Sequence, residues 1–290
     1  MARLLTQLRS SLDNLSPVQR RVAQYVLDNS GATIYHSVTE LAEAARASEG
    51  SVIRFCQDLG FSGFQEFKLT LAVELEPQSR AERLVGGGLR AATEDTAADD
   101  TDPAHLMTRL AASASTAMLE TADLFDLQAF SAVAEHLARA DRVDVYGVGA
   151  SGVVAQYFAY KLLRLGLPVQ AHTDMHLGSM SASNLREGAV AIGISSSGST
   201  LDTLQALTTA KEAGAFTVAV TNRLKSPLAK VAHRSLFASP PESPLTGGDV
   251  FAKIGQLLVL EALARLLVES DAGLQDVVER TARVVADRSM

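Results

Sequence analysis

Cysteine is almost absent from this chain of 290 residues, which contains Cys56 alone. A single cysteine cannot form an internal disulfide, so the chain is not a disulfide-stabilised secreted domain, and a reducing cytoplasm is the expected environment. The six histidines are scattered, and only His172 and His176 approach the spacing of metal ligands. We therefore expect no metal site.

Long apolar runs are missing as well. The apolar segment 257–260 is soon interrupted by Glu261 and Arg265, and no stretch approaches the roughly 18–20 apolar residues that cross a membrane. The N-terminal residues include Arg3 and Asp13 and lack the apolar core of a signal peptide. The sequence thus predicts a globular cytoplasmic protein without membrane association, long enough for one large or two ordinary domains.

An excess of positive charge is also lacking. The net charge is −7, and residues 1–80 carry eight Lys and Arg against nine Asp and Glu. Such a chain is not suited to coating nucleic acid indiscriminately, so contacts with DNA phosphates must be few and well placed. We expect a homodimer or homotetramer, in which several binding sites act together to raise the affinity.

Residues 1–76 are predicted to form an all-helical domain. Ser37 and Glu40 form a capping box at the start of one helix. Ser48 is expected to cap the following helix, and Gly60 to end it in the left-handed conformation that glycine tolerates.

The composition changes over residues 77–104, which we predict to be a flexible linker, because three glycines (86–88) precede an acidic stretch of small residues (91–102). Beyond it, residues 105–290 are predicted to form a second domain in which strands and helices alternate. Strands are expected at 143–146, 167–171, 189–194, 216–220 and 235–238. This alternation predicts an α/β domain with a doubly wound, mainly parallel five-stranded sheet, whose core spans about 125–270.

The segment 48–61 has the pattern of the second helix of a helix-turn-helix motif. On this helix Val52, Phe55 or Cys56, and Leu59 share a buried face. The opposite face and the N-terminus present the candidate DNA-binding residues Ser48, Gly50, Ser51, Arg54 and Gln57. Small residues let the backbone approach phosphates, and arginine donates two hydrogen bonds to guanine. A helical dimerisation domain is the alternative, and a carboxylate at position 49 would repel DNA phosphates.

Two loops after predicted strands carry the candidate ligand site. Residues 195–200, Ser-Ser-Ser-Gly-Ser-Thr, follow a buried strand and open a helix. Backbone N–H groups at a helix N-terminus attract anions, and five hydroxyls in six positions supply further donors. Residues 147–152, Gly-Val-Gly-Ala-Ser-Gly, follow an earlier strand in the same way. Both loops are expected at the carboxyl ends of parallel strands, where open α/β sheets bind ligands.

A dinucleotide-binding fold is the alternative for the glycine-rich loop. Asp174 fits the position of its ribose-binding acidic residue only loosely, so we favour a phosphorylated sugar and expect no cofactor. The candidate ligand-binding residues are Gly149, Ala150, Ser151, Ser195, Ser196, Ser197, Gly198, Ser199, Thr200, Glu242 and Lys253. Glu242 would contact sugar hydroxyls unless it is a solvated loop charge, and Lys253 would keep a cation near the ligand.

The N-terminal motif resembles the DNA-binding domain of the RpiR-type (MurR/RpiR) family of bacterial sugar-metabolism regulators. The resemblance rests on Ser48, Ser51, Val52, Arg54, Phe55, Cys56 and the segment 59–68. The two later loops resemble those of a SIS (sugar isomerase) domain, which follows the helix-turn-helix domain in that family. This implies that Ser151, Ser195, Ser196, Ser197 and Thr200 hold the phosphate of a phosphosugar. One departure is that many such regulators have a Ser-Arg pair at the start of the long helix after the last strand, where this chain has Phe251-Ala252-Lys253.

The two motifs together predict a transcription regulator of carbohydrate metabolism, not an enzyme, whose binding to a double-stranded DNA operator is modulated by a phosphorylated sugar. A phosphosugar isomerase is the alternative. Such an enzyme needs a base near its substrate, for which Glu242 and His172 are the candidates. A third hypothesis is a ligand sensor that binds a partner protein instead of DNA. Arg54→Ala should leave binding to such a partner intact but should abolish binding to an operator.

Overall fold

The computed structural model describes residues 4–12, 15–85, 103–240 and 250–286. The chain divides into two compact units, which part within helix α7 (Leu106–Asp123), between Ser115 and Thr116. In the described ranges, no helix is both long enough and apolar enough to span a membrane.

The described residues of the first unit form helices and no strand, which confirms the predicted all-helical N-terminal region. Its main helices are α1 (Leu4–Ser11), α2 (Pro17–Asp28), α3 (Ser30–Thr33), α4 (Val38–Ala44), α5 (Glu49–Asp58) and α6 (Phe64–Val85). The capping box of Ser37 and Glu40 is present at the start of α4. Gly60 ends α5 with a φ of 92°, in the left-handed region.

The core of the first unit lies between α2, α5 and α6. Val22 and Val26 from α2 and Phe55 from α5 are completely buried, and the ring of Phe55 contacts Phe67 of α6 edge-on, with 5.8 Å between the centroids. Such edge-to-face contacts are favourable for aromatic pairs. These contacts fix the buried face of α5 and leave its opposite face exposed.

Helix α6 runs further than the sequence indicates. It continues to Val85, whereas the predicted linker begins at residue 77. Residues 78–85 include Ala, Arg, Glu, Gln and Leu, all strong helix formers, and they prolong the helix beyond Pro77. A short 3-10 helix, η2, occupies Pro103–His105 at the other end of the predicted linker, and residues 86–102 lie outside the described residues.

The second unit is an α/β domain with one five-stranded sheet, as predicted. Its strands are β1 (Arg142–Tyr146), β2 (Val169–His172), β3 (Ala189–Ile194), β4 (Phe216–Thr221) and β5 (Arg234–Phe237). They lie in the order β2-β1-β3-β4-β5 and all pair in parallel. The helices before, between and after them are α8 (Leu127–Ala138), α9 (Ala150–Arg164), α10 (Met175–Ser183), α11 (Leu201–Glu212), α12 (Pro227–Val231), α13 (Val250–Ser270) and α14 (Ala272–Ala286).

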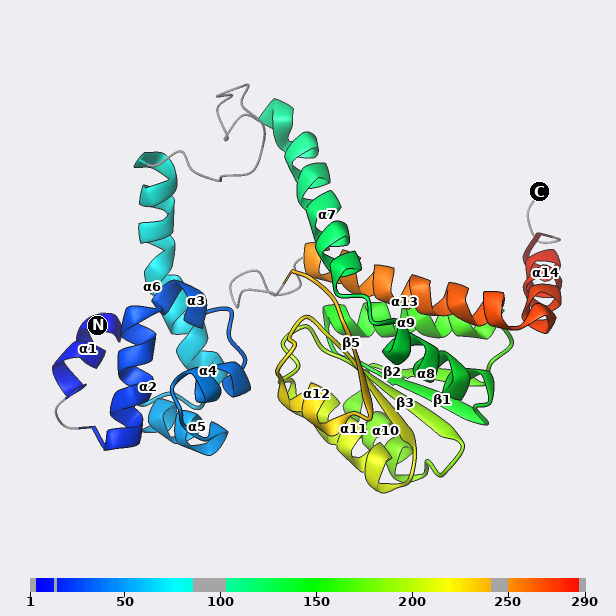
Figure 1. Ribbon diagram of the computed structural model, residues 1–290, viewed down its shortest axis with the longest axis horizontal. Helices are drawn as coiled ribbons and strands as arrows, with labels where there is room; N and C mark the ends of the chain where they lie inside the picture. The colour runs from blue at the N-terminus through cyan, green and yellow to red at the C-terminus, as the bar shows by residue number, and fades with distance from the viewer. Residues whose placement is uncertain (1–3, 13–14, 86–102, 241–249, 287–290) are drawn as a thin grey trace. The chain divides into compact units, whose positions relative to one another are not determined.

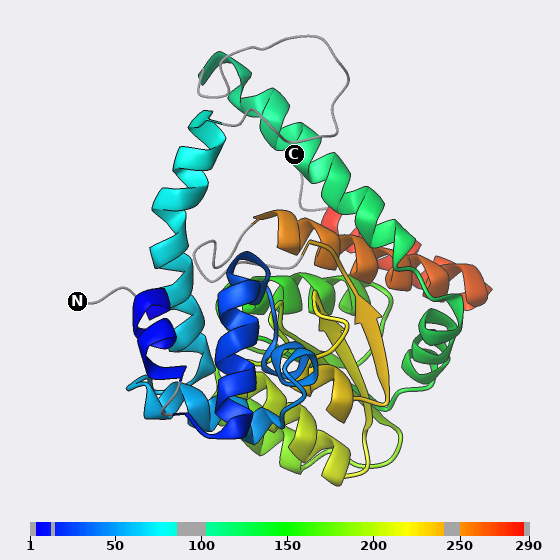
Figure 2. The ribbon, with the colours of Figure 1, turned by 60° about the vertical axis from the view of Figure 1, so that its left-hand side comes forward.

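Helices cover both faces of this sheet (Figure 1 and Figure 2). The helices α8, α9 and α13 pack on one face, and α10, α11 and α12 on the other. Strand β3 is buried throughout. Its larger residues, Val190, Ile192 and Ile194, belong to the core on the α9 and α13 side. On the other face Gly193 leaves room for α11, because a Cβ there would lie 3.3 Å from Leu207.

Candidate functional site

The loop between β1 and α9 is tightly folded around its glycines. A Cβ on Gly147 would lie 2.6 Å from the carbonyl oxygen of Ser151, and Gly149 has a φ of 57°. Side chains are excluded at such distances and disfavoured at such angles. The turn directs Ser151 into the first helical turn of α9, where it is 8% exposed.

The loop between β3 and α11 is folded as tightly. Gly198 has a φ of 60°, and a Cβ there would lie 2.2 Å from Ser226 Oγ. Its N–H donates to Ser195 Oγ at 3.1 Å, and its carbonyl accepts from the N–H of Leu228 at 2.9 Å. The glycine therefore lets the loop close against α12.

The hydroxyls of the second loop interact with one another. Ser195 Oγ lies 2.9 Å from Thr200 Oγ1 and 3.5 Å from Ser197 Oγ. The N–H of Ser199 donates to Ser197 Oγ at 3.2 Å. The hydroxyls of Ser195, Ser197 and Thr200 thus converge, whereas Thr200 makes no capping hydrogen bond to the helix it precedes.

Helix α13 brings two further polar residues to these loops. Lys253 Nζ donates to Ser196 Oγ and, at 3.3 Å, to Ser151 Oγ, so one ammonium group connects the two loops. Gln256 is completely buried and donates from Nε2 to Ser196 Oγ at 3.1 Å. Gln256 is not among the ligand-binding residues predicted from the sequence. The available signal was a polar side chain in an apolar stretch of helix, one turn after Lys253.

A cavity of about 170 Å³ lies where these groups meet. It is lined by Val148, Ala150, Ser151, Ser195, Ser196, Ser197, Thr200 and Lys253, and we call this set the cradle. The structure therefore brings together seven of the predicted ligand-binding residues. Gly149, Gly198 and Ser199 shape the two loops without lining the cavity, and Glu242 lies outside the described residues. The cradle combines a cation with several hydroxyls, a donor set suited to an anion.

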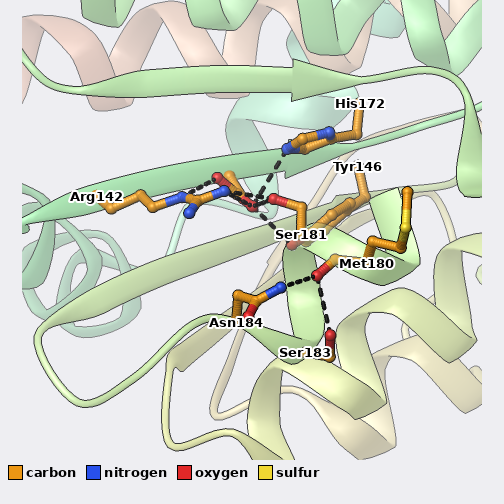
Figure 3. Close-up of polar contacts among 8 residues, drawn as sticks. Arg142, Tyr146, His172, Met180, Ser181, Ser183 and Asn184 are labelled. Atoms are coloured by element: carbon orange, nitrogen blue, oxygen red, sulfur yellow. Dashed lines mark hydrogen bonds and ion pairs between the residues drawn. The ribbon is translucent and has the colours of Figure 1, made fainter. Parts of the chain in front are cut away.

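The histidine considered as a base belongs to a different cluster (Figure 3). His172 is 5% exposed, and its Nε2 lies 3.2 Å from Oδ2 of the fully buried Asp144. Its ring stacks on Tyr146, with 5.3 Å between the centroids. Arg142, Ser181 and Tyr146 donate hydrogen bonds to the Asp144 carboxylate. His172 therefore packs between the sheet and α10.

The surroundings of Asp144 control its ionisation. Burial raises the pKa of this carboxyl group, but hydrogen bonds from His172, Ser181 and Arg142 lower it by more, to about 2. The carboxylate consequently stays charged at neutral pH. Burial, together with the charge of Asp144, raises the pKa of the Tyr146 hydroxyl, so Tyr146 remains a neutral donor.

The acidic residue of the dinucleotide alternative is also engaged elsewhere. Asp174 Oδ1 accepts from the N–H groups of His176 and Leu177 at 2.9 and 3.2 Å, which makes it the N-cap of α10. This local role explains an Asp at that position without a ribose. His176 is exposed in the first turn of the same helix.

The candidate DNA-binding residues lie on α5 and its N-terminus. Gly50, Arg54 and Gln57 are exposed, and Ser51 is half-buried. Ser48 caps the helix by accepting from the N–H of Ser51 at 3.2 Å, and the two hydroxyls lie 2.8 Å apart. The opposite face is buried, as the periodicity predicts, through Val52, Phe55 and Cys56. Burial raises the pKa of the Cys56 thiol to about 12.

The turn before α5 is held by Arg21, which no pattern in the sequence singles out. Arg46 has a φ of 50°, an uncommon conformation for a residue with a side chain. Arg21 of α2 donates to the carbonyl oxygens of Ala45 and Arg46 at 3.3 and 2.8 Å. Because these atoms lie far apart in sequence, the residue pattern gives no signal for the contact.

The carboxylate at the start of α5 has a partner within the motif. Glu49 Oε1 accepts from the hydroxyl of Thr39, at 2.6 Å, in the first turn of α4. The residue therefore links the two helices of the motif, in addition to its favourable position at a helix N-terminus.

Comparisons with known proteins agree with this arrangement of two units. Residues 2–78 match the helix-turn-helix domain of the rpiR family, and residues 136–266 match the SIS domain. The chain is 37% identical to the uncharacterized HTH-type transcriptional regulator TTE0211 of Caldanaerobacter subterraneus subsp. tengcongensis, over 100% of this chain and 99% of the relative. It is 28% identical to the HTH-type transcriptional regulator RpiR of Escherichia coli K12, over 89% of this chain and 84% of that protein.

A solved structure is similar over nearly the whole chain. This is the NanR protein of Vibrio vulnificus complexed with ManNAc-6P, at a TM-score of 0.87 and 33% identity. The similarity covers 99% of this chain and 100% of that chain.

Proposed function

This chain belongs to the rpiR family of helix-turn-helix transcriptional regulators that carry a SIS domain, and on that premise we propose that it regulates carbohydrate-metabolism genes in response to a phosphorylated sugar. The sugar phosphate binds in the cradle, and its binding changes the affinity of the N-terminal unit for operator DNA. The observation that carries this proposal is the bridge that Lys253 makes between the two hydroxyl-bearing loops.

The chemistry of the cradle supports a phosphate as the recognised group. Its hydroxyls and the Lys253 ammonium are hydrogen-bond donors gathered at the carboxyl ends of β1 and β3. Charge-assisted hydrogen bonds to phosphate oxygens are among the strongest in proteins. NanR, at 33% identity, was solved with a sugar phosphate, which supports the same ligand class here. The predicted contact of Glu242 with sugar hydroxyls remains part of the proposal.

The exposed face of α5 supports DNA as the partner of the first unit. We assign Ser48, Gly50, Ser51, Arg54 and Gln57 to the DNA contact, with Arg54 reading a base edge in the major groove. Because the first eighty residues carry nearly balanced charge, the proposal includes a homodimer or homotetramer that presents several reading helices to one operator. A cytoplasmic location follows from operator binding.

A regulator fits the described residues of the cradle better than an isomerase does. Moving a proton between adjacent sugar carbons requires a base within hydrogen-bond reach of the substrate. Among the described residues that line the cradle, none is a histidine, an aspartate or a glutamate. His172, the candidate base, instead lies against Asp144.

Two variants test the proposal by separating its halves. Calorimetry measures the binding of ManNAc-6P, glucose 6-phosphate and the unphosphorylated sugars to the full chain. A gel shift measures its binding to the DNA upstream of its own gene, with and without these sugars. Arg54→Ala should abolish the shift while leaving sugar-phosphate binding intact. Ser196→Ala should weaken sugar-phosphate binding while leaving the shift in ligand-free protein intact.

Three outcomes would contradict the proposal. If neither sugar phosphate binds, the effector half fails. If a sugar phosphate binds but never alters the gel shift, the coupling fails. If Arg54→Ala binds operator DNA as tightly as the parent chain, α5 is not the reading helix.

A further inference from the structure

We propose that the cradle selects the doubly ionised form of a phosphate monoester over singly charged anions, because a series of hydrogen bonds fixes the Ser196 hydroxyl as a donor and no described side chain lining the cavity carries a carboxylate or an imidazole. This inference rests on the function proposed above, and it specifies which charge state of the phosphate the site accepts. This series of hydrogen bonds begins at the backbone carbonyls of Pro240 and Ala252, passes through Asn222 and Gln256, and ends at Ser196.

The first link fixes the orientation of Asn222, which is 6% exposed. Its Nδ2 donates to the carbonyl oxygens of Pro240 and Ala252 at 3.0 and 3.3 Å. A carbonyl oxygen can only accept a hydrogen bond. The amide group of Asn222 must therefore direct its Oδ1 toward the remaining neighbour, Gln256.

The second link transfers this orientation to Gln256. Its Nε2 lies 2.8 Å from Asn222 Oδ1 and 3.1 Å from Ser196 Oγ. Since Asn222 presents an acceptor, the group facing it must be the NH₂ of Gln256. The second hydrogen of that NH₂ then points at Ser196.

The third link fixes the hydroxyl of Ser196. Its oxygen accepts from Gln256 and also from the Lys253 ammonium, which has no lone pair with which to accept. A serine oxygen has two lone pairs, so both are used. The proton of this hydroxyl remains, and it is available only as a donor to a group in the cavity. Ser151 likewise accepts from Lys253 and retains its proton.

The second loop adds donors, and its side chains carry no carboxylate or imidazole. Ser195 Oγ accepts from the N–H of Gly198 and shares one hydrogen bond with Thr200 Oγ1. Whichever of the two hydroxyls donates, the other keeps a proton for the cavity. The carbonyl oxygens of Val148, Ser195 and Ser196 already accept from backbone N–H groups.

The donor pattern determines which phosphate fits. A phosphate dianion presents only acceptors, whereas the monoanion carries a P–OH proton that needs an acceptor. Among the described residues lining the cradle, none carries a carboxylate or an imidazole to supply one. The second pKa of a phosphate monoester is about 6, so affinity should fall about tenfold between pH 7.5 and pH 5 as the dianion is depleted. A sulfate ester, singly charged throughout, should bind weakly at every pH.

The histidines near the cradle contact other groups than the bound phosphate. The ionisable side chains on α13, on the loops and on the elements packed against them include Glu120, Asp123, Glu135, His136, Arg139, Arg142, Asp144, Tyr146, Tyr157, Tyr160, Lys161, Arg164, His172, Asp174, Asp202, Lys211, Glu212, Arg223, Lys225, Lys230, His233, Arg234, Lys253, Glu261, Arg265, Glu269, Asp276, Glu279, Arg280 and Arg283. His172 lies against Asp144, and His136 stacks on Phe216, the first residue of β4, at the other end of the sheet. His176, exposed at the start of α10, serves as a control.

The test is calorimetric titration of the full chain with ManNAc-6P and with glucose 6-phosphate between pH 5 and pH 8, alongside the 6-sulfate esters of the same sugars. The parent chain and His176→Gln should lose about tenfold in affinity for a phosphate between pH 7.5 and pH 5. Gln256→Met removes the NH₂ that fixes Ser196, so its hydroxyl can turn to accept a P–OH. This variant should bind the dianion about 10- to 100-fold more weakly and show a clearly smaller loss on acidification.

The outcomes separate the inference from the function it rests on. Phosphate binding with an affinity that does not change with pH, or equal binding of the sulfate ester, overturns the charge selection and leaves the proposed function standing. A full pH response in Gln256→Met overturns the role of the series of hydrogen bonds. If neither sugar phosphate binds at any pH, the charge selection is refuted for these two ligands, and the proposed function loses its support from both of them.

Discussion

Replacing Asp144 by asparagine should destabilise the second unit in a way that depends on pH. Asp144 is fully buried and accepts from Arg142, Tyr146 and Ser181. Its pKa falls from the usual 3.8 to about 2 in the folded protein. Each pKa unit corresponds to about 1.36 kcal/mol, so the charged carboxylate stabilises the fold by roughly 2 kcal/mol at neutral pH.

The sign of the pH dependence follows from the lowered pKa. Because the folded state holds the proton less tightly than the unfolded state, the stabilisation is complete above about pH 4 and is lost as the pH falls toward 2. Asparagine has no such charge. The difference in stability between the parent chain and Asp144→Asn should therefore shrink to about half by pH 3.

Differential scanning calorimetry of the full chain measures this difference. At pH 7 the transition of the second unit should fall by about 4–8 °C, while that of the first unit stays in place. Asp276→Asn, an exposed change on α14, should leave both transitions unmoved. An unchanged melting temperature in Asp144→Asn at pH 7, or a deficit as large at pH 3 as at pH 7, would refute the reasoning.

Three further predictions concern the two sites. Gly198→Ala should weaken sugar-phosphate binding at least tenfold by calorimetry, because φ is 60° and the new Cβ would lie 2.2 Å from Ser226 Oγ; parental affinity would show that the loop tolerates a side chain. Lys253→Met should lower that affinity about 10- to 100-fold, since a charge-assisted contact is lost, whereas the exposed Lys230→Met should not. Cys56 should stay unreactive toward a thiol reagent at pH 8 until the protein is denatured, because its thiol is buried with a pKa of about 12; rapid labelling of the native chain would contradict the packing of α5.

Local signals in the sequence account for most of the fold. The buried run of β3 and the capping box of Ser37 depend on neighbouring residues, and the structure has both as predicted. The hydroxyl-rich loop was identifiable for the same reason, since Ser195 and Thr200 lie within six consecutive residues. Helix α6 continues past Pro77 into the predicted linker, because the helix formers that follow the proline favour the helix over the linker that the composition indicates.

What the sequence did not reveal depends on contacts between distant segments. Gln256 reaches Ser196 only because α13 packs beside the ends of the strands, and Arg21 reaches the turn at Ala45 only because α2 packs beside it. Asp144 was detectable in principle, because it is a charged residue inside the predicted strand 143–146. Its partner His172 could not be assigned to it without the pairing of β1 with β2.

The most direct test measures operator affinity with and without effector. Fluorescence anisotropy of labelled upstream DNA, at one fixed salt concentration, gives the dissociation constant of the full chain in the absence and presence of a saturating sugar phosphate. We expect the phosphorylated sugar to change this dissociation constant at least fivefold, in either direction. Its unphosphorylated form should cause no change, and Lys253→Met should abolish the effect. An identical dissociation constant with every sugar phosphate that binds the chain would contradict the account.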